Sequence, residues 1–145
     1  MGNIRKVFHV KHFPMIRLFT SKTQQTGQIG EDKAVRFLMK QGYLILNRNL
    51  NNRHGEIDIV ASKKKTHYFF EVKTGRQGSW FNPADNLTKE KLWKFFRAVE
   101  YEIIGQKWAK DKGAVKIKDY KIQGILVLLP EDDKMPPSIE IIDLS

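Results

Sequence analysis

Residues 55–73 read GEIDIVASKKKTHYFFEVK, two short apolar segments joined by a basic turn. This pattern predicts a β-hairpin with strands over Gly55–Ala61 and His67–Thr74, joined by a turn over Ser62–Thr66. Charged residues stand among the Ile, Val and Phe residues of both strands: Glu56, Asp58, Glu71 and Lys73. Because charges are costly to bury unless they are paired or bind a metal, the hairpin is also the first candidate site.

The spacing of the charged residues predicts which of them meet. Side chains alternate between the two faces of a strand, so Glu56 and Asp58 share one face, and Glu71 and Lys73 share a face of the next strand. If the hairpin closes symmetrically about Lys64–Lys65, Asp58 lies opposite Glu71, and Glu56 lies opposite Lys73. We therefore expect two carboxylates at a distance where like charges repel.

Two interpretations of this pair are open. Carboxylates held close together resist ionising together, and a bound divalent cation removes the conflict. Because the chain has no Cys, oxygen ligands point to Mg²⁺ or Mn²⁺ rather than to zinc. In the alternative, Glu56 and Lys73 form a cross-strand ion pair, while Asp58 and Glu71 are solvated on an open sheet face.

The segment before the hairpin is predicted to hold a helix, a strand and a loop. The helix spans about Gln28–Gln41, with Thr26 as its cap and Gly42 at its end. A strand over Tyr43–Asn47 and a polar loop over Asn47–His54 follow.

The segment after the hairpin is predicted to hold a helix over Thr88–Gly105 and strands over Lys121–Leu129 and Ser138–Leu144. The apolar residues of that helix recur at core spacing: Leu92, Phe95, Val99 and Ile103. The fold class is α/β, a mixed central sheet flanked by helices in the order α-β-β-β-α-β-β.

The composition and net charge of the chain indicate what kind of partner it binds. The chain has 145 residues and a formal net charge of +10, which favours a polyanion such as a nucleic acid. Its apolar runs are too short to span a bilayer, and the lack of Cys fits a cytoplasmic protein. Residues 1–25 carry no acid and are expected to be a basic flexible tail, with a transit peptide or a start at Met15 as alternatives. Residues 26–145 would form the domain.

The charged hairpin resembles the PD-(D/E)xK nuclease superfamily, with Ile57-Asp58 and Glu71-Val72-Lys73 matching its pattern and Ile57 in place of Pro. A wider frame resembles the YraN-like family of small bacterial proteins of unassigned function, which is similar in fold to archaeal Holliday junction resolvases. The frame consists of Gly30-Glu31, Ala34, Phe37-Leu38, Gly42-Tyr43, Arg48-Asn49, Gly55-Glu56-Ile57-Asp58, Phe70-Glu71-Val72-Lys73, Pro83, Thr88 and Lys91. The resemblance covers about Gly27 to the C-terminus and implies a restriction-endonuclease-like fold.

The resemblance also implies roles. Asp58 and Glu71 would bind the metal, Lys73 would assist the attacking water, and Glu31 would help to hold the metal or the water. Glu56 belongs to the GEID signature of the YraN-like family and would support the site.

Two departures from the YraN-like pattern stand near the site. Thr74 and Gly75 come before Arg76, whereas the family has an Arg sooner after the lysine. Gln123 stands where the family has an Asp, so activity depends on whether that position takes part in the chemistry.

Phosphate contacts should dominate the affinity for a nucleic acid. The candidate cations are Arg48, Arg53, Arg76, Lys89, Lys91, Lys94 and Arg97. On the second helix Lys89, Trp93 and Arg97 form a stripe, which either binds phosphate or is a solvated face. Trp80 and Phe81 could stack on bases or pack in the core, and His54 could reach the site or stay idle. Without a base-reading motif, we expect selectivity for shape.

Three functions compete. The leading one is a metal-dependent endonuclease acting on branched or single-stranded DNA, by analogy with the resolvases a possible homodimer. The second is a nucleic-acid-binding module that cleaves weakly or not at all, and the third is a basic adaptor for acidic proteins.

Overall fold

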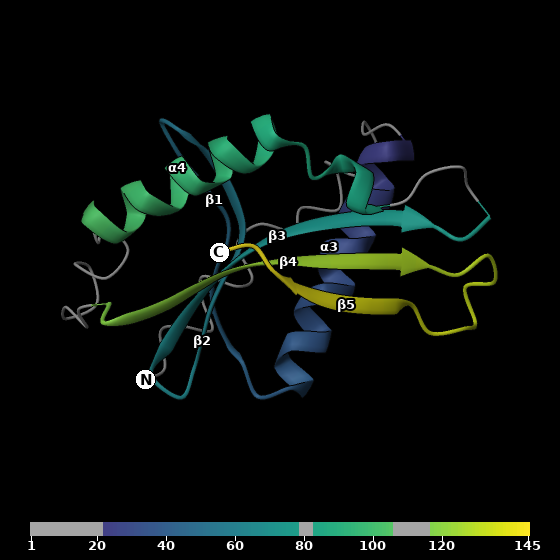
Figure 1. The fold of residues 1–145 in the computed structure, drawn as a ribbon. Coiled ribbons are helices and arrows are strands. Elements are labelled where there is room, and N and C mark those ends of the chain that lie inside the picture. The colour runs from purple at the N-terminus through teal and green to yellow at the C-terminus, as the bar shows by residue number, and fades with distance from the viewer. Residues whose placement is uncertain (1–21, 79–82, 106–116) are drawn as a thin grey trace.

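The computed structural model describes residues 22–78, 83–105 and 117–145 of the chain (Figure 1). Its elements, in chain order, are α3 (Lys22–Lys40), β1 (Leu44–Asn52), β2 (Gly55–Lys63), β3 (Thr66–Arg76), the short 3-10 helix η1 (Pro83–Asn86), α4 (Lys89–Gly105), β4 (Asp119–Leu129) and β5 (Ser138–Asp143). This confirms the predicted α/β class and the order α-β-β-β-α-β-β.

The five strands form one mixed sheet in the order β1-β2-β3-β4-β5. Neighbouring strands are antiparallel except for β3 and β4, which are parallel. A parallel pair needs a long crossover, and α4 lies within that connection. One buried cluster packs α3 on the sheet through Ala34 and Leu38, and a second packs α4 on it through Phe95 and Val99. In Figure 1, α3 runs behind β3, β4 and β5, and α4 crosses above them.

Helix α3 begins earlier than its sequence indicated. It starts at Lys22, so Thr26 lies inside the helix and is not its cap. The last four residues of the expected tail are therefore helical, whereas residues 1–21 lie outside the described part of the chain. The predicted end at Gly42 is confirmed, because Gly42 has a φ of +89° and the Tyr43 N–H donates to Leu38 O at 3.0 Å.

The loop predicted over Asn47–His54 is wrong, because most of it continues strand β1. Arg48 pairs in register with Ile59, Leu50 with Ile57, and Asn52 with Gly55. Leu50 packs on the α4 cluster. Pairing with β2 gives hydrogen-bond partners to backbone N–H and C=O groups of this polar segment. Asn49 sits at a φ of +50°, a conformation that Asn tolerates better than most residues.

The hairpin of β2 and β3 closes as its symmetry predicted. Lys63 pairs with Thr66 across a two-residue turn, and the register runs to Ile59 opposite Phe70. Lys64 and Lys65 have φ values of +48° and +68°, as a type I′ turn requires. The turn is thus shorter than the expected five residues, and both strands are longer.

Helix α4 lies where its pattern placed it. Thr88 precedes it and caps it, accepting the Lys91 N–H on its hydroxyl at 3.3 Å. Phe95 and Val99 are buried as predicted, whereas the buried stripe also includes Ala98 and Glu102. Within the described ranges, no helix is long and apolar enough to cross a membrane.

Candidate functional site

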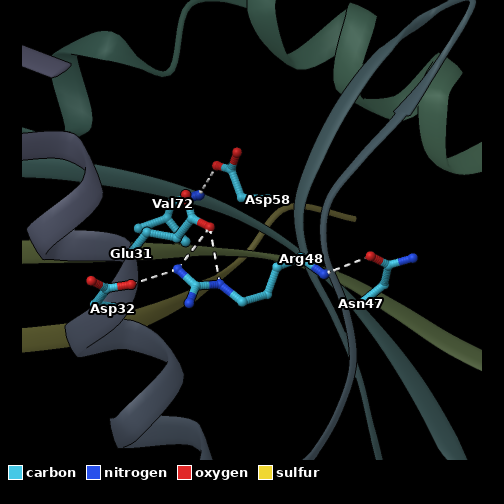
Figure 2. A network of polar contacts seen from close by, with 6 residues as sticks. All are labelled: Glu31, Asp32, Asn47, Arg48, Asp58 and Val72. Carbon is cyan, nitrogen blue, oxygen red and sulfur yellow. Dashed lines mark hydrogen bonds and ion pairs between the residues drawn. The ribbon is translucent and has the colours of Figure 1, made fainter. Parts of the chain in front are cut away.

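The site forms where β2 and β3 separate. The paired register ends at Ile59 and Phe70, one residue short of Asp58 and Glu71. Instead of a backbone contact, the Val72 N–H donates to Asp58 Oδ2 at 2.7 Å (Figure 2). This bond fixes the carboxylate of Asp58 against β3.

Four carboxylates act on one another at this point. Burial raises the pKa of Asp58 well above its usual range, and the charge of Glu71 raises it further, against the opposing effect of the Val72 hydrogen bond. Glu31 and Glu56 add smaller effects of the same sign on that pKa. The predicted pairing of Asp58 with Glu71 lies beyond the register of β2 and β3, but the charge of Glu71 acts on Asp58. Like charges at such a place favour protonation or a bound cation.

Lys73 pairs with Glu71 rather than with Glu56. Its Nζ lies 3.1 Å from Glu71 Oε1, and both side chains are largely shielded from solvent. Burial raises the pKa of Glu71, whereas the charge of Lys73 and its hydrogen bond oppose that rise. The alternative interpretation is thus not what the structure shows: Lys73 makes its ion pair within its own strand, and Asp58 and Glu71 are not fully solvated.

Glu31 reaches the site from α3 because the helix comes very close to the sheet. Gly30 is buried, and a Cβ added to it would overlap the hydroxyl and methyl groups of Thr74 on β3. Only glycine allows this approach, and the next residue, Glu31, is thereby brought beside β3. Burial raises the pKa of Glu31, with Arg48 opposing that rise.

Arg48 is part of the interior of this site and not of its surface. Its exposed fraction is 5%, and its Nη2 lies 2.7 Å from Asp32 Oδ1 and 3.1 Å from Glu31 Oε1 (Figure 2). Its Nε also donates to Glu31 Oε1 at 3.3 Å. The prediction that Arg48 contacts a nucleic acid is therefore corrected. The residue was assigned to a loop, so its place in a buried strand was missed.

The other predicted cations differ in their exposure and in their contacts. Lys91, exposed at the start of α4, is close enough to lower the pKa of Glu71. Arg76 lies 3.7 Å from Asp133, with both side chains exposed. Lys89, Lys94 and Arg97 are exposed on α4.

Aromatic residues of α4 contact three of the predicted residues. The Arg97 guanidinium lies over the ring of Trp93 at 5.0 Å, and that ring is 59% exposed. Arg53 lies over the ring of Tyr101 at 5.9 Å, and His54 contacts the same ring edge-on at 5.4 Å. Trp80 and Phe81 lie outside the described residues.

Gln123 lies on the opposite side of the sheet from Glu71 and Lys73. It pairs in register with Phe70, whereas Glu71 pairs with Gly124. Because in-register neighbours of a parallel pair share a face, Gln123 faces the α3 cluster that contains Phe70. Its Oε1 is buried without a hydrogen-bond partner. The amide at this position therefore does not face Glu71 or Lys73.

The donor set fits a hydrated hard cation better than a closed metal cage. Among residues 22–78, 83–105 and 117–145, no group of three His, Cys, Asp or Glu side chains is placed to hold a metal. Mg²⁺ is commonly held by only one or two carboxylates and keeps several waters. Asp58 and Glu71 are such a pair. Burial raises the pKa of both carboxyls, the charge of Glu71 adds to the rise at Asp58, and a cation would stabilise their charged forms.

Comparison with known proteins gives a family without an assigned activity. The sequence model of "Uncharacterised protein family UPF0102" matches residues 30–118. A UPF0102 protein of Fusobacterium nucleatum is 35% identical over 101 residues, covering 70% of this chain and 77% of that protein. One from Caldicellulosiruptor saccharolyticus is 42% identical over 84 residues, covering 58% and 71%. A third, from Campylobacter jejuni, is 40% identical over 80 residues, covering 55% and 70%.

Proposed function

We propose that this chain, which belongs to the uncharacterised protein family UPF0102, is a metal-dependent endonuclease that hydrolyses phosphodiester bonds in DNA. The observation that carries the proposal is the partly buried pair Asp58 and Glu71, whose charged forms burial disfavours and a cation would stabilise, with Lys73 Nζ at 3.1 Å from Glu71 Oε1. The likeness to the PD-(D/E)xK nucleases supports it as a resemblance in the sequence alone.

Each residue of the site has a part in the proposed reaction. Asp58 and Glu71 would hold Mg²⁺ or Mn²⁺, which when bound polarises a phosphate and lowers the pKa of a water. Lys73 places an ammonium group beside Glu71, where it can bind a phosphate oxygen and stabilise developing negative charge. Glu31 offers a carboxylate near Asp58 that can accept a hydrogen bond from a water. Glu56, which is exposed, adds negative charge at the solvent side of the site.

The substrate class follows from the surface around the carboxylates. Exposed cations on α4 and at the end of β3 suit a phosphate backbone, and the formal charge of +10 favours binding of polyanions. We propose a preference for branched or single-stranded DNA, because the sequence offers no base-reading motif. Action as a homodimer and a cytoplasmic location are parts of the same proposal.

Cleavage assays test this function. Junction, flap, single-stranded and duplex substrates are incubated with Mg²⁺ or Mn²⁺ and with wild type, Asp58→Asn or Lys73→Met. We expect metal-dependent cleavage by wild type of at least one branched or single-stranded substrate, no cleavage by Asp58→Asn and much slower cleavage by Lys73→Met. Equal cleavage by all three proteins would trace the activity to a contaminant and overturn the proposal.

A second candidate function is a nucleic-acid-binding module that cleaves weakly or not at all. The observation that favours it is the lack of a three-residue metal-binding group in the described part of the chain. It predicts salt-dependent DNA binding without any rise in melting temperature on addition of Mg²⁺ or Mn²⁺. Thermal denaturation with and without each metal separates the two functions.

A further inference from the structure

We propose that Arg48 is a positioning residue of the carboxylate site, which directs Glu31 toward Asp58 and thereby sets the affinity for the cation. This inference rests on the proposed function, because it assigns a role within the same site. Arg48 does not touch the substrate or the cation in this scheme. It acts through the carboxylate that it holds.

The contacts of Arg48 tie strand β1 to helix α3. Its guanidinium bridges two consecutive residues of the helix, Glu31 at 3.1 Å and Asp32 at 2.7 Å. Its backbone pairs with Ile59, the residue next to Asp58. In Figure 2, Glu31 lies between Arg48 and the contact of Asp58 with Val72. Arg48 therefore fixes the distance between α3, which carries Glu31, and β1, which pairs with the strand that carries Asp58.

Arg48 contacts only one of the two carboxylate oxygens of Glu31. Both hydrogen bonds from Arg48, from Nε and from Nη2, go to the same atom, Oε1. This leaves Oε2 for a donor on the side of the site. A rigid guanidinium that donates two bonds from one plane restrains the carboxylate more strongly than an ammonium group would.

Electrostatics agree with this arrangement. Glu31 is one of the charges that raise the pKa of Asp58, so the two carboxylates lie near each other. Burial raises the pKa of Glu31, and Arg48 opposes that rise and so favours the charged form. A hydrated cation at Asp58 would keep waters that need oxygen acceptors, and Glu31 supplies one. Partners that orient metal-bound groups commonly change metal affinity by tenfold or more.

Two isosteric substitutions test the direction of the contact. Glu31→Gln and Asp32→Asn both keep an oxygen that can accept from Arg48, but only the first removes charge beside Asp58. Mn²⁺ binding is measured by calorimetry on the full chain. We expect about a tenfold loss of affinity for Glu31→Gln and a change within about twofold for Asp32→Asn.

Removal of Arg48 separates positioning from simple stabilisation. Arg48→Met leaves Glu31 buried without its partner, and we expect a lower melting temperature and weaker Mn²⁺ binding. The double variant Arg48→Met/Glu31→Gln removes the guanidinium and the more buried of its two carboxylate charges, so the melting temperature should recover in part while Mn²⁺ binding stays weak. Arg48→Lys keeps the positive charge but not the planar arrangement of donors, and it should recover only part of the affinity.

The outcomes are distinct. If the double variant recovers both the melting temperature and Mn²⁺ affinity, Arg48 has only a structural role. Wild-type affinity in Glu31→Gln overturns the positioning proposal but leaves the endonuclease proposal intact. A wild-type protein that binds no Mn²⁺ and cleaves no substrate overturns the endonuclease proposal itself, and the role of Arg48 with it.

Discussion

The carboxylate of Asp58 accepts the backbone N–H of Val72 at 2.7 Å, one residue beyond the last paired residues of β2 and β3. A side chain thus links two strands that have begun to part. The gap leaves Asp58 near Glu71, and it opens the same place to Glu31 from the helix layer. The bond to Val72 stabilises a charge that burial and its neighbours disfavour.

The pH dependence of stability should expose that unfavourable charge. The pKa values of Asp58, Glu71 and Glu31 are raised in the folded chain, so proton binding favours the folded state. This stabilisation is complete below the usual carboxyl pKa range and is lost as pH rises through the raised values. With a chelator present to remove metal ions, we expect the free energy of unfolding from urea titrations to fall as the pH rises above the usual carboxyl pKa range.

Asp58→Asn is the matched control for this pH dependence. Asn can still accept the Val72 N–H through its side-chain oxygen, but it carries no charge. The variant should be more stable than wild type at pH 7 without metal, and its stability should depend less on pH. It should also gain no stability from Mg²⁺ or Mn²⁺. A variant less stable than wild type at pH 7 would show that the charge is not a strain on the fold.

The close approach of α3 to β3 predicts opposite effects for two glycines of one helix. Gly30→Ala would force a methyl group against Thr74, and overpacking of this kind costs about 1–3 kcal/mol. Gly27 has nothing within 4 Å of an added Cβ, so Gly27→Ala should stabilise the helix by about 0.5–1 kcal/mol. Urea denaturation of both variants measures the difference.

A second substitution checks the cause of the Gly30 effect. Thr74→Ala removes the hydroxyl and methyl groups that an added Cβ would meet first. Gly30→Ala/Thr74→Ala should therefore be more stable than the sum of the two single changes predicts. Strict additivity would mean that Gly30 matters for some reason other than contact with Thr74.

Local patterns in the sequence predicted the hairpin and its charged face. Two apolar segments around a short basic turn fix the register through symmetry, and alternation then places Asp58 with Glu71. The ends at Gly42 and Thr88 were also predictable, because helix caps depend on residues next to them in the chain.

Features that depend on distant contacts were not predictable in this way. The Asn-rich end of β1 has low strand propensity and is a strand because it pairs with β2 and packs Leu50 on the α4 cluster. Arg48 looks like a surface cation until the helix layer brings Glu31 and Asp32 to it. The departure of Lys73 from its expected partner has the same origin, since β2 leaves β3 before Glu56 can face it.

The tip of the hairpin offers a stabilising change away from the site. Lys64 and Lys65 hold positive φ values that Asn and Gly adopt at lower cost. Lys64→Asn/Lys65→Gly should raise the free energy of unfolding by about 1 kcal/mol. Lys64→Gln/Lys65→Gln removes the same two charges without the turn preference and should leave stability unchanged. An equal gain in both variants would assign the effect to charge instead of backbone conformation.

Lys91 should contribute to DNA affinity. It is exposed, and its charge opposes the rise in the pKa of Glu71. A phosphate beside the carboxylates would therefore be attracted by Lys91. Lys91→Gln should weaken binding at low salt and reduce the slope of log affinity against log salt by about one. Lys134→Gln, in the exposed loop between β4 and β5, is the control and should keep the wild-type slope. The same loss in both variants would mean that only net charge matters.

Lys73 should separate catalysis from metal binding. Its ammonium group lies 3.1 Å from Glu71, so Lys73→Met removes a positive charge that competes with a cation there. We expect Mn²⁺ affinity to be unchanged or higher, while the cleavage rate falls by about a hundredfold or more because the charge that stabilises the phosphate is lost. Calorimetry gives the affinity, and single-turnover cleavage gives the rate. Asp58→Asn should lose both properties together. A Lys73→Met variant that cleaves at the wild-type rate would limit Lys73 to balancing the charge of Glu71.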